Sequence, residues 1–179
     1  MKREMLRDHD GSSLHHATSG FALAALVVAT VAVVVPEVDA IASSEARGIA
    51  LADTNAIGAA LRRAIGDLGD PRESSAGLVP EWFVGPGVLP RGAAVERPCR
   101  FPLSGVLASD RLGAGGRWRG PYLSSVPIDP WGRAYVVMPC GPGRDAPTLV
   151  VSAGADGVLD SVPGRRAIAD GDVGIVLMP

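Results

Sequence analysis

A block of fifteen apolar or small residues near the amino terminus dominates the hydropathy pattern. Residues 21–35 read FALAALVVATVAVVV and follow twenty largely polar residues, in which three Lys and Arg are balanced by three Asp and Glu. Fifteen residues are fewer than the roughly 20 that span a bilayer as a helix. A buried core helix would also fit the block, but the abrupt change from polar to apolar residues favours a targeting segment.

Beyond Pro36, apolar residues recur near the helical period of 3.6 residues. They are Val38, Ile41, Ile49, Ile57, Leu61, Ile65 and Leu68. Gly69 and the Asp70-Pro71 pair end the pattern, as helix stop signals do. We therefore expect one helix over residues 21–68, about 70 Å long at 1.5 Å per residue, which Pro36 kinks but does not end.

The rest of the chain predicts loops followed by strands. Residues 69–119 are rich in Pro and Gly, so we expect the least regular structure there. The aromatic side chains in or next to this region are expected to be packing residues. They are Trp82, Phe83 and Trp118. Val- and Tyr-rich runs then predict antiparallel strands at 133–138, 148–152 and 173–178, with the tetrad DPWG at 129–132 as the turn before the first.

Composition and charge exclude several classes of function. The 179 residues carry a formal net charge of −2, which argues against a general nucleic-acid binder. All three histidines precede the apolar block, so removal of the leader leaves no histidine for a catalytic triad or a zinc site. Two cysteines are too few for a structural zinc site, and the chain has no GxxxxGK[ST] phosphate loop. We expect no enzyme activity.

Two processing schemes fit the amino-terminal segment. In the first, a signal peptide ends at Val38-Asp39-Ala40, and cleavage after Ala40 releases a soluble protein. In the second, the cut lies between Gly20 and Phe21. The sequence SGFALAALVV resembles the processing site of type IV prepilins and pseudopilins. That resemblance implies a leader at 1–20, a methylated Phe21 and an apolar segment, 21–35, that anchors the subunit in the membrane and later packs in a filament core.

The last third of the chain carries a more specific resemblance. The residues concerned are Tyr122, Leu123, Pro127, Asp129 to Gly132, Tyr135, Ser152 and the GADG sequence at 154–157. Together they resemble the carboxy-terminal domain, here 120–179, of the G-type (major) pseudopilin of type II secretion. The resemblance implies an α+β, pilin-like fold, in which a long amino-terminal helix packs on a small antiparallel sheet.

The same resemblance implies a structural role. The subunit would sit in the inner membrane as a single-pass protein, with its carboxy-terminal domain in the periplasm. Its partners would be the prepilin peptidase, the inner-membrane assembly platform and other pseudopilins in a short filament. Ala25 stands where the family usually has a Glu that docks new subunits; this departure argues against standard major-subunit assembly, and some minor subunits also lack the Glu.

The resemblance further implies a calcium ion bound by an acidic loop. Asp156 and Asp172 match the acids of the family, while Gly171 separates Asp170 from Asp172 where the family has an adjacent pair. Further candidate ligands are the Asp170 and Asp160 carboxylates and the carbonyls of Ala153 and Ala155. Calcium takes six to eight oxygen ligands. Without the resemblance, the Asp-Gly pairs of this loop indicate only turns.

Cys99 and Cys140 are a candidate disulfide, because an oxidising compartment favours pairing. The family does not generally have this pair, and two free thiols are the alternative. Two other readings of the whole chain also stay open. One is a soluble exported binding module stabilised by calcium, and the other is a type IV pilin or minor pilin used in adhesion or DNA uptake.

Overall fold

The computed structural model describes residues 14–68, 82–92, 100–109, 117–139, 147–163 and 165–178, with side chains from residue 40 onward. It divides into two compact units, Met1–Ala42 and Ser43–Pro179. Residues 1–13 and the side chains of residues 14–39 lie outside this description. The expected leader at 1–20, the cleavage point at Gly20 and Phe21, and the expected anchor at 21–35 all fall on these residues. No helix in the described part of the chain is long and apolar enough to cross a membrane.

Helix α1 (Leu14–Leu68) contributes its second half to the larger unit. Its buried face follows the helical period and is formed by Ala50, Thr54, Ile57, Ala60, Leu61 and Ala64. The buried hydroxyl of Thr54 donates to the carbonyl oxygen of Leu51 at 2.9 Å, so it is satisfied within the helix. The helix therefore meets the sheet through small residues as much as through large ones.

This face corrects the predicted apolar stripe in part. Ile57 and Leu61 are buried as expected, and Leu68 and Ile65 are half-buried. Ile41 and Ile49 are exposed, Ile49 by 49%. The reason is their place on the helix: the buried row runs through Ala50, Thr54 and Ile57, and Ile49 lies one residue, about 100° of helical rotation, away from it. At Gly58 the helix backbone lies close to β5, since a Cβ atom there would stand 2.7 Å from Ile175 Cδ1.

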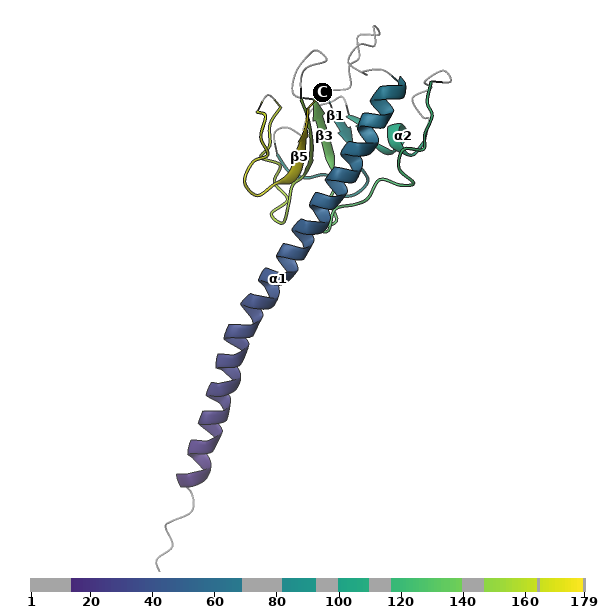
Figure 1. Cartoon of the computed structure of the whole chain (residues 1–179). Helices are drawn as coiled ribbons and strands as arrows, with labels where there is room; N and C mark the ends of the chain where they lie inside the picture. Colours follow the sequence, from purple (N-terminus) through teal and green to yellow (C-terminus); the bar gives the residue numbers. More distant parts are fainter. Residues whose placement is uncertain are drawn as a thin grey trace, which may run out of the picture. The chain divides into compact units, whose positions relative to one another are not determined.

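Five strands form one mixed sheet in the order β2-β1-β3-β4-β5 (Figure 1). The strands are β1 (Trp82–Val84), β2 (Arg100–Pro102), β3 (Val136–Pro139), β4 (Thr148–Ser152) and β5 (Val173–Leu177). The predicted antiparallel pairing holds for β3, β4 and β5. It is wrong for the whole sheet, because β1 and β2 pair in parallel and come from the region expected to be least regular.

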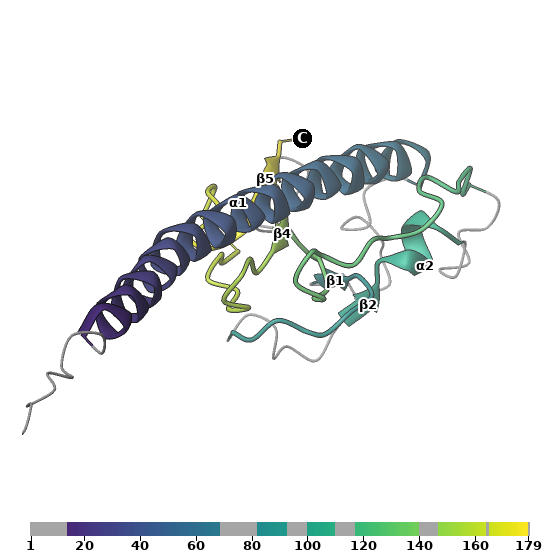
Figure 2. The same ribbon diagram turned by 90° about the horizontal axis from the view of Figure 1, so that it is seen from below.

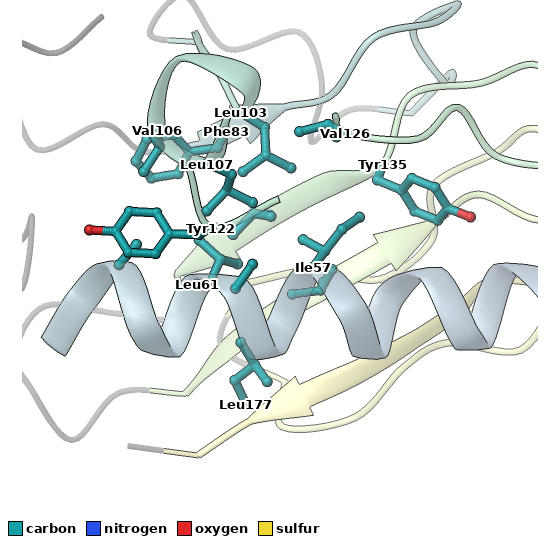
Figure 3. Packing of buried hydrophobic residues seen from close by; sticks show 14 residues of the cluster. Ile57, Leu61, Phe83, Leu103, Val106, Leu107, Tyr122, Val126, Tyr135 and Leu177 are labelled. Carbon is teal, nitrogen blue, oxygen red and sulfur yellow. The ribbon is translucent and has the colours of Figure 1, made fainter. Parts of the chain in front are cut away.

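Apolar side chains alternate between the two faces of this sheet. One face is covered by α1 and carries Phe83, Val137, Val150 and Leu177. Figure 2 shows α1 lying across the sheet, and Figure 3 shows Phe83 and Leu177 near the helix. The opposite face is lined by Trp82, Val136, Met138, Leu149, Val151 and Val176. Leu159 and Ile168, from the loop between β4 and β5, pack against this second face. The loop predicted to bind calcium therefore covers the second apolar face of the sheet.

Short elements complete the core at the end of α1. Helix α2 (Ser104–Leu107) buries Val106 and Leu107, and the indole N–H of Trp118 donates to the Val106 carbonyl at 3.1 Å. Trp118 meets Tyr122 edge to face, with ring centroids 5.8 Å apart. The packing role predicted for the three aromatic residues is confirmed, since Trp82 and Phe83 are also buried.

Two tyrosines connect α1 to the rest of the unit by hydrogen bonds. The buried Tyr135 hydroxyl donates to Asp53 Oδ2 at 2.8 Å, and the pKa of Tyr135 is raised, chiefly by burial and then by this aspartate. The Tyr122 hydroxyl donates to Asp67 Oδ2 at 3.0 Å, and Arg63 Nη2 donates to the Tyr122 carbonyl at 2.7 Å. These contacts fix the helix at two points along its length.

The sheet topology bears on the cysteines, which both lie outside the described residues. Arg100 starts β2 opposite Trp82, and Pro139 ends β3 at the same edge of the sheet. Since β1 lies between them, the two strands are about 10 Å apart at roughly 4.8 Å per step. The Cα atoms of a disulfide lie within about 7 Å, and the pairing of Cys99 with Cys140 stays a prediction.

We predict that Cys99 and Cys140 form a disulfide in protein taken from the periplasm. Mass spectrometry without reductant should find the peptides that contain them linked. Closing a loop of this length should stabilise the fold by up to about 4 kcal/mol in the chain-entropy model, so reductant should lower the urea midpoint. Two thiols that react fully with an alkylating reagent before reduction would contradict the prediction.

Candidate functional site

The tetrad DPWG forms a turn that is organised by the carboxylate of Asp129. Asp129 Oδ1 accepts hydrogen bonds from the backbone N–H groups of Trp131 at 3.0 Å and Arg133 at 2.7 Å. The Asp129 side chain is only 4% exposed, so these bonds form away from competing water. Gly132 has a φ of +81°, in the left-handed region that favours glycine. The Asp129 carboxylate and the Gly132 backbone therefore shape the turn that leads into β3.

The second oxygen of Asp129 connects this turn to the end of β4. The hydroxyl of Ser152 donates to Asp129 Oδ2 at 2.6 Å, and the same Ser152 oxygen accepts the N–H of Gly154 at 3.1 Å. Ser152 is fully buried. Hydrogen bonds to an ionised carboxylate are about twice as strong as neutral ones. The two motifs of the sequence, DPWG and S-x-GADG, are thus one hydrogen-bonded unit.

The GADG turn is compact and meets the far end of the acidic loop. Gly154 has a φ of +60°, and a Cβ atom on it would collide with the carbonyl oxygen of Gly171. Within the turn, the Gly157 N–H donates to the Ala153 carbonyl at 3.2 Å, and the Val158 N–H donates to Asp156 Oδ1 at 3.0 Å. The beginning and the end of the loop therefore lie against each other beside the sheet.

At that far end, Asp172 is buried, and one of its two carboxylate oxygens has no partner in the described part of the chain. Asp172 Oδ2 accepts the backbone N–H groups of Ser161 at 2.6 Å and Asp160 at 3.1 Å. Asp172 Oδ1 has no hydrogen-bond partner among the described residues, although the side chain is only 6% exposed. Burial raises the pKa of Asp172, against the lowering effect of these hydrogen bonds. An unpaired buried carboxylate oxygen is the kind of group that a bound cation satisfies.

The other candidate ligands are placed differently. Asp156, Asp160 and Asp170 are exposed, as is Ala155, and the carbonyl of buried Ala153 already accepts the Gly157 N–H. Asp156 Oδ2 faces Gly171, at 3.5 Å from where a Cβ atom would lie on that glycine. In the described part of the chain, no three Asp, Glu, His or Cys side chains gather as a metal-binding group. A cation here would need backbone carbonyls besides carboxylates.

Comparison with known proteins gives a match to one family model. Residues 104–170 match the family model of type II secretion system (T2SS) protein G. The resemblance to the G-type pseudopilins is confirmed. The match spans both signature turns and begins at α2, earlier than the domain start expected at residue 120. No curated protein and no solved structure matches the chain.

One part of the site lies outside the pseudopilin match and was not predicted. Residues 85–92, which we call the strap, run beside both signature turns: the Val88 N–H donates to the Gly132 carbonyl at 3.1 Å, and the Arg91 N–H donates to the Gly157 carbonyl at 2.9 Å. Two arginine side chains also bind the GADG turn, Arg133 at the Gly154 carbonyl and Arg91 at the Asp156 carbonyl. The N–H groups of Val88 and Arg91 make the first two strap contacts with backbone carbonyls. Since any residue type can form such bonds, no residue pattern in the sequence signals them.

We predict that the Asp129 carboxylate stabilises the larger unit, because its removal leaves three donors, two N–H groups and one O–H group, without their acceptor. Asp129→Ala should lower the free energy of unfolding of the Ser43–Pro179 fragment by about 3 kcal/mol or more. Ser152→Ala should cost less, about 1–3 kcal/mol. Urea unfolding in EDTA measures both. The exposed Asp170→Ala is the matched control, expected within about 0.5 kcal/mol of wild type.

The two changes should also be coupled, because both remove the same hydrogen bond. The loss in Asp129→Ala/Ser152→Ala should be smaller than the sum of the single losses by about 1 kcal/mol. Additive losses would mean that the contact between the two motifs contributes nothing to stability.

A pH dependence follows from the raised pKa of Asp172. The native state binds this proton more tightly than the unfolded chain, so the contribution of Asp172 is most favourable below the unfolded pKa of about 3.9 and is lost as pH rises through the folded pKa. In EDTA, the stability of wild type relative to Asp172→Asn should therefore decrease between about pH 4 and pH 8. Urea titrations at several pH values test this. A constant difference across the range would contradict it.

Proposed function

We propose that this chain is a structural subunit of a periplasmic pseudopilus that supports type II protein secretion. The observation that carries the proposal is the match of residues 104–170 to T2SS protein G, in which DPWG and GADG, the motifs of the resemblance, form one hydrogen-bonded unit. A pseudopilin is a building block and not an enzyme. The work of secretion would come from filament assembly.

The amino-terminal segment would supply membrane attachment and assembly. Prepilin peptidase would cut between Gly20 and Phe21, and Phe21 would be methylated. Residues 21–35 would then hold the subunit in the inner membrane, with the Ser43–Pro179 unit in the periplasm, until an assembly platform moves it into the filament. Other pseudopilins, or further copies of this chain, would be its neighbours there.

A calcium ion on the acidic loop is part of the proposal. Its support is the buried Asp172 Oδ1, which has no partner among the described residues, beside a loop end where Asp156 faces Gly171. Asp172 and Asp156 would hold the ion together with loop carbonyls. When bound, calcium would neutralise a carboxylate that burial disfavours and would hold the loop, with Leu159 and Ile168, against the second face of the sheet.

Calcium should accordingly stabilise the Ser43–Pro179 fragment. Binding to the native state alone adds about 2.7 kcal/mol at a concentration 100 times Kd, which should raise the melting temperature by several degrees. Thermal melts in EDTA and in millimolar calcium measure this shift. Asp172→Ala and Asp156→Ala should abolish it, whereas Glu45→Ala, an exposed acid on α1, should keep it. Coincident curves for the wild type would refute the calcium site.

Processing tests the function as a whole. Co-expression with a prepilin peptidase should give a mature chain that begins at Phe21, and Gly20→Val should block the cut. In a host deleted for this gene, folded exported proteins should accumulate in the periplasm, and wild type but not Gly20→Val should restore their secretion. Ala40→Val is the control and should leave both readouts unchanged.

Other mature ends identify the rival functions. A chain that begins at Ile41 would indicate the soluble exported binding module. Processing at Phe21 with normal secretion in the deletion strain would indicate a type IV pilin instead.

A further inference from the structure

Two arginine side chains bind the backbone of the GADG turn. Arg133 Nη1 donates to the Gly154 carbonyl at 2.7 Å, and Arg91 Nη2 donates to the Asp156 carbonyl at 3.0 Å. We infer that these two guanidinium groups hold the GADG turn in its native form without a metal ion. Arg91 and Arg133 are then positioning residues for the backbone of the turn, and calcium would instead join the Asp156 carboxylate of the turn to Asp172 at the other end of the loop.

Arg133 contacts the two signature turns through its backbone and its side chain. Its backbone N–H is fixed by Asp129 Oδ1, and its side chain is half-buried. The guanidinium packs directly on Gly157, where a Cβ atom would overlap Arg133 Cζ and Nε. Gly157 also has a φ of +73°, so glycine is required there both by the backbone conformation and by the arginine.

Arg91 is brought to the turn by the strap. Besides the bond from Arg91 to Gly157, the Leu159 N–H donates to the Arg91 carbonyl at 2.7 Å. At the other end of the strap, the Ala134 N–H donates to the Val88 carbonyl at 2.9 Å. The strap is thus bound to both signature turns. The Asp156 carbonyl, which the Arg91 side chain binds, is next in sequence to Gly157, which the Arg91 backbone binds. None of these strap residues lies in the 104–170 match.

The chemistry of the two side chains suits this role. A guanidinium keeps its charge at all ordinary pH values and presents five N–H donors in a rigid plane. A calcium ion could supply positive charge to the same carbonyl oxygens, but it would leave with a chelator, and an arginine does not. The loop therefore divides into a part held by arginines, residues 153–159, and a part next to Asp172 whose order can respond to calcium.

Hydrogen exchange on the full chain in detergent tests this division, with EDTA present. The amides of Gly157, Val158 and Leu159 are all hydrogen-bonded, and peptides that cover 153–159 should be protected in the wild type. Arg133→Ala and Arg91→Ala should each reduce this protection at least about tenfold, the effect of losing one charged hydrogen bond. Arg133→Lys should give an intermediate loss, because a lysine keeps the charge without the planar fork.

Two internal references show that such a loss is local. Peptides from β4 should keep their protection in every variant, and Arg166→Ala, which removes an exposed arginine from the same loop, should behave as wild type. Arg91 is exposed, so Arg91→Ala tests the inference even if Arg133→Ala fails to fold. Unchanged protection of 153–159 in Arg91→Ala and Arg133→Lys would overturn the inference. So would a wild-type turn that is protected only after calcium is added.

Discussion

The central constraint on this domain is that both faces of its sheet carry apolar side chains, so the sheet must be covered twice. Helix α1 covers one face with a continuous helical surface. Among the described residues, the other face is covered by the loop between β4 and β5, through Leu159 and Ile168. A helix satisfies its own backbone, but a loop that covers a core must find partners for each buried N–H and C=O. The buried polar groups of the domain are explained by that requirement.

The two signature motifs and Asp172 supply the hydrogen-bond partners of this loop at its two ends. Asp129 and Ser152 satisfy the backbone where the chain enters it, and Asp172 accepts two N–H groups where the chain leaves it. The strap and its arginine supply donors for carbonyls that the motifs do not reach. The cost of this arrangement is one buried carboxylate oxygen without a partner in the described structure, and it is there that a cation would contribute most.

Sequence patterns predicted those parts of the fold that have long or repeated signals. The strand at 148–152 and the end of α1 at Leu68 follow from runs, periodicity and stop signals, whereas the α+β class was implied by the family resemblance. Strands β1 and β2 were missed because three residues give no period, and their parallel pairing depends on a distant partner. Ile49 was misplaced because the buried row of α1 includes Ala50 and Thr54, which a stripe of large apolar residues does not contain. Within the site, the motifs identified Asp129, Ser152 and Asp172, but spacing alone did not reveal that Asp156, Asp160 and Asp170 are exposed, or that Arg91 and Arg133 bind the turn.

The fit of α1 against β5 at Gly58 has a mechanical consequence. At Gly58 the backbone of α1 lies so close to β5 that a Cβ atom there would stand 2.7 Å from Ile175 Cδ1. Asp53 and Asp67 are bonded to Tyr135 and Tyr122 on either side of that point, about 21 Å apart along the helix at 1.5 Å per residue. A pull along the part of α1 that lies in the Ser43–Pro179 unit would therefore be transmitted to the rest of that unit at three separate contacts and not at one.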